Sequence, residues 1–248
     1  MLLNDHFHLS YCTNIHPGES WRAVFTSLER YVLPIKRKLS PAAPFGIGLR
    51  LSDQASRELG ESNQLDRFRA WLDEHNCYVF TLNGFPYGGF HSQRVKDTVH
   101  RPDWTTRARV EYTKHLFDQL SALLPDQEAG GISTSPLSYK PWHENSAERE
   151  SALFRGTQHL LEIADYLFEL ERRTDQHLHL DLEPEPDGLL ENTAETVAYF
   201  NEWLLPMGIR HFADRLRPAD AESVIRRHIN LCYDVCHFAV EYEATAET

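Results

Sequence analysis

The chain has 248 residues, of which 41% are hydrophobic and 11% aromatic, so it can build a substantial core and is not a wholly disordered chain. Asp and Glu total 37 against 25 Lys and Arg, and the resulting formal charge of −12 disfavours binding to nucleic acid. No run approaches the ~18 apolar residues of a membrane span, and the first residues lack the basic and apolar regions of a signal peptide. With only 4 Cys, which do not make a disulfide framework in so long a chain, a cytoplasmic location is expected.

Short apolar runs alternate with longer segments of helical periodicity along the whole chain. Strands are predicted near 6–12, 46–52, 78–85, 131–135, 177–183 and 229–235. Helices are predicted near 19–39, 63–75, 104–124, 146–173, 193–205 and 219–228. Six β-then-α steps of this kind indicate a single α/β domain whose parallel sheet is covered by helices.

Helix boundaries are predicted from capping residues and prolines. Asn145 and Asn192 each stand three residues before a Glu, a pattern typical of the N-cap of a helix. Pro125 and Pro206 follow apolar helical stripes, and we expect each of them to end its helix.

The spacing of the predicted strands bears on the type of sheet. Successive strands begin about 45 residues apart, so an eight-stranded (β/α)8 barrel at this spacing would need roughly 360 residues. Six units are visible here. The chain therefore forms either an open six-stranded sheet or a barrel whose last two units are missing.

Polarity alternates along the predicted strands. In 177–183, Leu178, Leu180 and Leu182 share one face, while the other face carries His177, His179, Asp181 and Glu183. An antiparallel sheet with one face in water gives such a pattern, and so does a barrel with a polar mouth at the carboxyl ends of its strands. Long helices between the strands favour the barrel, and barrel enzymes carry their chemistry at this mouth.

The richest polar cluster is expected where the last two strands end. Glu183 ends one strand and Asp234 ends the next, and His237 follows closely enough to turn back into the mouth. Two carboxylates and an imidazole form the ligand set that Mn²⁺, Zn²⁺, Co²⁺ and Fe²⁺ accept. An ordinary ion-pair network is the alternative interpretation of the same three residues.

Further polar and aromatic side chains on the predicted inner faces and in the adjoining loops are candidates for substrate binding. Arg50 either pairs with a carboxylate at the mouth or holds an anionic substrate, and the ion pair is favoured. The glycine-rich segment that ends at His91 is either a simple turn or a loop lining a pocket. The full set of substrate-binding candidates is His8, Asn14, Arg50, Asn83, Tyr87, His91, Trp142 and Glu185.

Several of these segments together resemble a known superfamily. They are His8 to Glu19, Thr81 to His91, Gly131 to Leu137, Leu182 to Pro186, and Asp234-Val235-Cys236-His237. They are similar to the xylose isomerase-like superfamily of TIM barrels, and within it to the EboE-like subgroup, called metabolite traffic proteins. The superfamily includes sugar and sugar phosphate isomerases and epimerases and the endonuclease IV-type repair enzymes.

The resemblance implies a divalent-metal site at the carboxyl mouth, with Glu183, Asp234 and His237 as ligands. It also implies that Glu183 and His237 are catalytic, with Glu183 both binding the metal and moving a proton beside the substrate carbonyl. The family takes its other ligands from strands seven and eight, which have no counterpart here. Truncation after the sixth β/α unit is the preferred explanation, and completion of the barrel by a partner chain or a homo-oligomer comes second.

Three functions follow from these observations. The first is a metal-dependent, isomerase- or epimerase-like enzyme acting on a small hydroxylated metabolite. The second is a non-catalytic component that binds or transports such a metabolite. The third is an endonuclease IV-like phosphodiesterase, which the formal charge of −12 disfavours.

Overall fold

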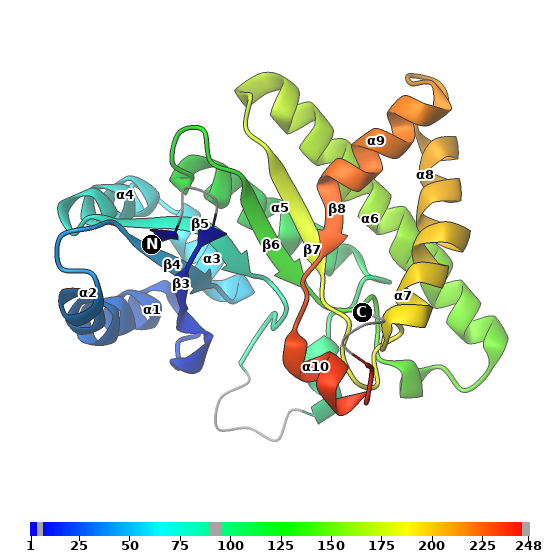
Figure 1. The fold of residues 1–248 in the computed structure, drawn as a ribbon, viewed down its shortest axis with the longest axis horizontal. Helices are drawn as coiled ribbons and strands as arrows, with labels where there is room; N and C mark the ends of the chain where they lie inside the picture. Colours follow the sequence, from blue (N-terminus) through cyan, green and yellow to red (C-terminus); the bar gives the residue numbers. More distant parts are fainter. Residues whose placement is uncertain (4–6, 90–95, 245–248) are drawn as a thin grey trace.

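A six-stranded parallel sheet is the centre of the molecule. The computed structural model describes residues 1–3, 7–89 and 96–244 (Figure 1). The strands lie in the sheet in the order in which they occur along the chain: β3 (Ser10–Cys12), β4 (Phe45–Arg50), β5 (Cys77–Asn83), β6 (Gly130–Thr134), β7 (Leu178–Leu182) and β8 (Ile229–Leu231). Each of the five strand pairs in this sheet is parallel. The antiparallel alternative is therefore wrong.

Helices connect and flank these strands. The α-helices are α1 (Trp21–Ser27), α2 (Leu33–Leu39), α3 (Asp53–Gly60), α4 (Gln64–Glu74), α5 (Arg107–Leu123), α6 (Ser146–Thr174), α7 (Thr193–Tyr199), α8 (Leu205–His211), α9 (Pro218–His228) and α10 (Val235–Val240). Short 3-10 turns cover Thr13–Ile15, Lys96–His100 and Lys140–Trp142. Within the described ranges, none of the helices is long and apolar enough to cross a membrane.

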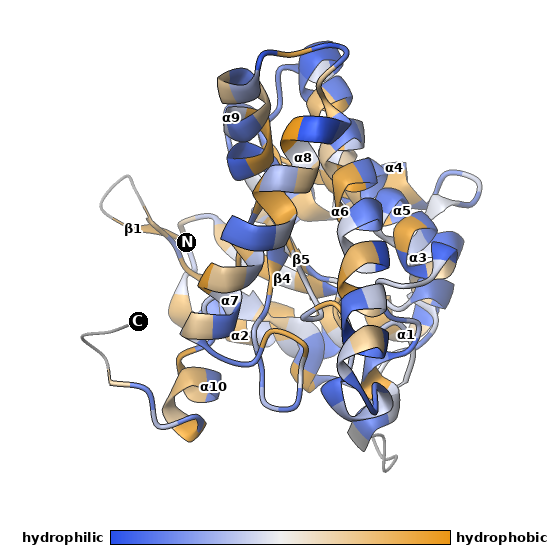
Figure 2. Ribbon diagram, turned by 90° about the vertical axis from the view of Figure 1, so that its right-hand side faces the viewer, coloured by the Kyte–Doolittle hydropathy of each residue, from blue (hydrophilic) through white to orange (hydrophobic). Residues whose placement is uncertain are grey.

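The apolar face of the sheet packs against the helices. Leu178, Leu180 and Leu182 of β7 are buried, and α6 and α9 contact this strand. Hydrophilic and hydrophobic residues alternate around α6 and α8 in Figure 2, as expected for helices with one buried side. The opposite face of β7 carries the half-buried His179 and Asp181, so the alternation predicted for this strand is confirmed.

The first predicted strand, 6–12, is divided into two short strands. Phe7–His8 forms β2, which pairs antiparallel with β1 (Leu2–Leu3) in a separate two-stranded sheet, and only β3 joins the main sheet. Residue 6 lies outside the described ranges. The division arises because the amino-terminal residues supply a pairing partner that the local polarity pattern does not reveal.

The last predicted strand, 229–235, is shorter than expected. It ends at Leu231, and α10 begins at Val235 with Asp234 as its N-cap. Leu231 is 45% exposed, so the buried face predicted for this strand is only partly covered. The strand pairs with β7 and, among the described residues, with no strand on its other side.

The capping predictions are confirmed, because the side chains of Asn145 and Asn192 each accept an N–H hydrogen bond at 3.0 Å from the Glu three residues later.

Pro125 follows the end of α5, as predicted. The prediction for Pro206 is wrong: the helix continues through it to His211. A π-helical turn, Phe200–Leu204, immediately precedes α8. This wider turn leaves space for the Pro206 ring, which would clash with the preceding carbonyl group in a regular α-helix.

Helix α3 was not predicted. It has only eight residues, and its buried apolar residues are Ala55 and Leu59, so the apolar pattern is too short to indicate a helix. Its N-cap is Ser52, whose hydroxyl accepts a hydrogen bond from the Ala55 N–H at 3.0 Å.

Candidate metal centre

Glu183, Asp234 and His237 meet at the carboxyl end of β7 and β8, where α10 begins (Figure 1). One ligand atom from each residue lies within 4.8 Å of the other two, a spacing at which one cation could contact all three. His237 Nδ1 is 3.9 Å from Glu183 Oε1, and His237 Nε2 is 3.5 Å from Asp234 Oδ2. The structure thus brings together the three residues that the sequence places at this end of the sheet.

Backbone interactions hold Glu183 in place. Its N–H donates to the Thr134 carbonyl at 2.9 Å, which continues the pairing of β7 with β6 beyond the last strand residue. Pro184 follows directly and restricts the backbone at this point. The position of the carboxylate therefore depends on the sheet itself.

Asp234 and His237 are held by the first turn of α10. Asp234 Oδ1 accepts the Cys236 N–H at 2.7 Å, so Oδ2 is the oxygen that faces the histidine. His237 Nδ1 lies 3.0 Å from the Pro184 carbonyl. Because a carbonyl can only accept, Nδ1 carries the proton, and the Nε2 lone pair is left to bind a cation.

The electrostatics of the cluster favour a bound cation. Burial raises the pKa of Glu183 to about 7; His237 opposes this effect and Asp234 adds to it. The thiol of Cys232 also faces Glu183, and burial together with this carboxylate raises the pKa of the thiol to about 12. Two carboxylates and an imidazole form a ligand set that fits Mn²⁺, Zn²⁺, Co²⁺ or Fe²⁺. Such an ion would place a positive charge beside the buried Glu183 carboxylate and so stabilise its ionised form.

Glu185 lies beside this cluster in an aromatic environment. Its Oε1 is 3.1 Å from His100 Nε2, and the His100 ring lies 5.1 Å from the ring of Tyr139 and 6.2 Å from that of Trp142. Burial raises the pKa of Glu185 to about 8, with Glu183 as the next cause, and burial lowers the pKa of His100 to about 4. The structure therefore places Glu185 and Trp142 near one another.

The sequence alone gives no indication of the role of His100. It lies in a 3-10 turn far from any predicted strand, and a lone histidine in a loop gives no signal of its own.

The other predicted binding residues near the carboxyl ends have mainly structural contacts. Arg50 is 2% exposed and pairs with Glu19 at 3.0 Å, as the favoured interpretation expected. The Asn83 side chain accepts the Phe85 N–H at 3.3 Å, and the Tyr87 ring packs 5.0 Å from that of Tyr112.

Asn14 lies half-buried in the 3-10 turn that follows β3. His91 lies outside the described residues.

His8 is at the other end of the sheet. It precedes β3 and contacts Tyr78 and Glu128, which stand at the start of β5 and before β6. In a parallel sheet these positions lie at the amino end, far from Glu183. The structure therefore does not bring His8 together with the candidate metal ligands.

No protein-family model matches the chain, and no curated protein matches it.

Proposed function

We propose that Glu183, Asp234 and His237 bind one divalent metal ion, and that the chain is an isomerase- or epimerase-like enzyme acting on a small hydroxylated metabolite. The observation that carries this proposal is the convergence of three ligand atoms within 4.8 Å at the carboxyl end of a sequentially ordered parallel sheet. The sequence resemblance to xylose isomerase-like barrels, and to the EboE-like metabolite traffic proteins among them, supports the same assignment.

Each residue then has a defined part. A bound divalent ion would polarise a substrate carbonyl and so acidify the neighbouring C–H. Glu183 would hold the ion through one carboxylate oxygen, and its other oxygen would be available to take a proton and return it to the adjacent carbon. His237 keeps Nε2 directed at the site because Nδ1 donates to the Pro184 carbonyl. Asp234 provides the second carboxylate from a position that the start of α10 holds in place.

Metal binding is the first test. We expect equilibrium dialysis against Mn²⁺ or Zn²⁺, with elemental analysis, to give one ion per chain for the wild type and at least about tenfold weaker binding for Glu183→Gln and Asp234→Asn. Asn is as good an N-cap as Asp, so Asp234→Asn keeps the start of α10 while removing the charge.

Asp187→Asn is the matched control. Asp187 lies in the same β7–α7 connection, is exposed, and has a φ of 65°, which Asn also adopts readily. It should bind the ion as the wild type does. Equal binding by all four proteins, or no binding by any of them, would show that the proposed ligand set is wrong.

Turnover is tested separately with the metal-loaded protein. We expect a panel of aldoses and ketoses in D₂O to show deuterium incorporation next to the carbonyl of at least one sugar, and Glu183→Gln to abolish it. Metal binding without exchange on any sugar would favour the non-catalytic alternative, a component that binds or transports the metabolite.

A further inference from the structure

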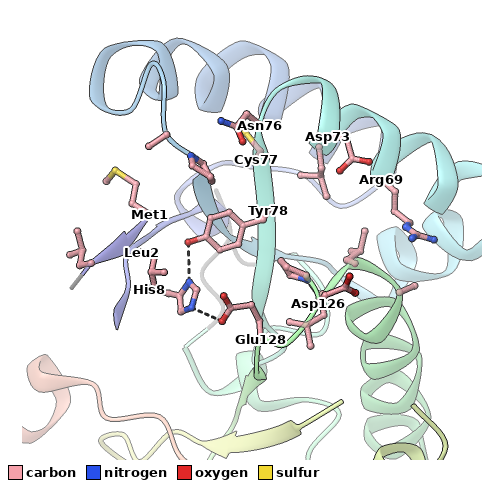
Figure 3. Close-up of a pocket in the computed structure, with 18 residues that line it drawn as sticks. Met1, Leu2, His8, Arg69, Asp73, Asn76, Cys77, Tyr78, Asp126 and Glu128 are labelled. Carbon is pink, nitrogen blue, oxygen red and sulfur yellow. Dashed lines mark hydrogen bonds and ion pairs between the residues drawn. The ribbon is translucent and has the colours of Figure 1, made fainter. Parts of the chain in front are cut away.

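A cavity lies at the amino end of the sheet, opposite the candidate metal centre (Figure 3). Its volume is about 680 Å³, within the range of small-molecule sites. The walls come from β1, from the ends of α4 and α5, and from the start of β5.

A hydrogen-bonded group of three side chains lines this cavity. His8 Nε2 is 2.8 Å from Glu128 Oε2, and His8 Nδ1 is 2.9 Å from the Tyr78 hydroxyl. Because an ionised carboxylate only accepts, Nε2 donates to Glu128, and in the tautomer with its proton on Nε2 alone, Nδ1 accepts the Tyr78 proton. The phenolic oxygen then has lone pairs to offer, and Glu128 Oε1 accepts no hydrogen bond from the residues that the structure describes.

The charge of the lining is negative. The lining contains three carboxylates, from Asp73, Asp126 and Glu128, but only two positive groups, Arg69 and the amino group of Met1. The amino group already donates to the Leu9 carbonyl at 2.6 Å. Helices α4 and α5 both end at this cavity, and the carbonyl groups of a helix C-terminus add partial negative charge.

Apolar side chains make up the rest of the wall. Leu72, Leu123 and Leu124 line the cavity, and so do Leu2 and Leu3 of β1. A ligand that fits must therefore combine an apolar body with a group that donates hydrogen bonds and carries positive charge.

We propose that this cavity binds a small organic amine in its ammonium form, with the ammonium group donating to Glu128 Oε1 and to the Tyr78 oxygen and the apolar body lying against the leucines. The three-residue group also ties β2 to the sheet, but that structural role accounts neither for the volume beside it nor for the excess of carboxylates. The proposal does not depend on the function proposed for the metal centre.

The probes are three compounds that share a phenyl ring but differ in charge: 2-phenylethylamine, 2-phenylethanol and phenylacetate. The chain has 2 methionines, and Met1 lines the cavity whereas Met207 lies on α8. In protein labelled with [¹³C-methyl]methionine, we expect the amine to shift the Met1 signal with a dissociation constant of about 1 mM or tighter and to leave Met207 unchanged. Phenylacetate should leave both signals unchanged, and 2-phenylethanol should bind at least about tenfold more weakly than the amine.

Variants identify the contacts. Glu128→Gln and Tyr78→Phe should each weaken binding of the amine, the first by about tenfold or more because it removes the charged partner. Glu74→Gln, an exposed carboxylate on α4 outside the lining, and Glu183→Gln, in the metal centre, should leave binding unchanged.

A Met1 signal that does not respond to the amine, or that responds equally to phenylacetate, would overturn the proposal. The same holds if Glu128→Gln and Tyr78→Phe both bind as the wild type does. The wild-type comparison of probes decides the question even if one variant fails to fold.

Discussion

Each end of the sheet holds a histidine beside at least one carboxylate, but the two ends differ in how well these groups are paired. At the amino end, both ring nitrogens of His8 have hydrogen-bond partners, at 2.8 and 2.9 Å. At the carboxyl end, His237 faces Asp234 and Glu183 at 3.5 and 3.9 Å, and the pKa of Glu183 is raised to about 7, chiefly by burial.

The difference separates a histidine whose ring nitrogens are already paired within the fold from one whose neighbouring carboxylates are only partly matched. A group whose hydrogen bonds are complete stabilises the fold without a further component. Carboxylates that are buried without a matching cation destabilise the empty protein, and a bound ion reverses that effect. By this criterion the carboxyl end would gain more stability from a bound cation than the amino end, which agrees with the metal site proposed for it.

The largest expected effect concerns the carboxyl end in metal-free protein. Burial and Glu183 raise the pKa of Glu185 from 4.5 to about 8, so folding favours the protonated form. The resulting stability is present below pH ~4.5 and is lost as the pH rises through ~8. We expect urea unfolding with a chelator present to show that the free energy of unfolding falls between pH 5 and 8.5 by about 2–4 kcal/mol more for the wild type than for Glu185→Gln.

Glu150→Gln is the control, because Glu150 is an exposed carboxylate on α6 and its replacement should reproduce the wild-type pH curve. If the free energy of unfolding depended on pH in the same way for Glu185→Gln and the wild type, burial of Glu185 would not destabilise the carboxyl end, and the difference between the two ends of the sheet would disappear.

A smaller change in the free energy of unfolding is expected for a substitution in the middle of the sheet, between the two ends. A Cβ at Gly131 would lie 2.5 Å from His179 Cε1 and 2.6 Å from Asp181 Oδ2. These two side chains are hydrogen-bonded to one another through His179 Nδ1 and Asp181 Oδ1. Gly131→Ala should therefore lower the free energy of unfolding by about 1–3 kcal/mol. At Gly88 no heavy atom lies within 4 Å of an added Cβ, so Gly88→Ala should change it by less than about 0.5 kcal/mol. Equal stability of the two variants would mean that the inner face of the sheet is not tightly packed.

The smallest change in the free energy of unfolding is expected for a substitution at the amino end of the sheet. Tyr78→Phe removes one hydrogen bond to His8 and should lower the free energy of unfolding by about 1 kcal/mol. Tyr242→Phe, at a residue that is 95% exposed, should have no measurable effect in the same denaturation experiment. A loss for Tyr78→Phe no larger than for Tyr242→Phe would mean that the polar group of the amino end contributes nothing to the fold.

The parts of the fold that depend on local patterns were predictable. The alternation of leucines with polar residues in β7 identified a strand with one buried face, and the adjacent strand ends identified the Glu183, Asp234 and His237 cluster. Asn145 and Asn192 marked helix starts because a cap bonds only to residues of its own first turn.

Features that depend on distant partners were not predictable in this way. His8 has the alternation of a strand that continues to β3, but its pairing with Leu2 places it in another sheet at the amino end. The pairing of Glu185 with His100 joins residues 85 positions apart, and nothing in either segment indicates the other. The exposure of Leu231 likewise depends on what lies next to β8, which local polarity does not show.

The π-helical turn before Pro206 also sets the rotational phase of α8. A π turn contains about one residue more than an α turn, and one residue corresponds to about 100° around the helix axis. With this offset, Gly208 faces Ile225 of α9 so closely that a side chain there would collide with it. A regular helix through Phe200–Leu204 would turn Gly208 away and present a neighbouring side chain to Ile225. The close approach of α8 and α9 therefore depends on one additional residue in the preceding turn.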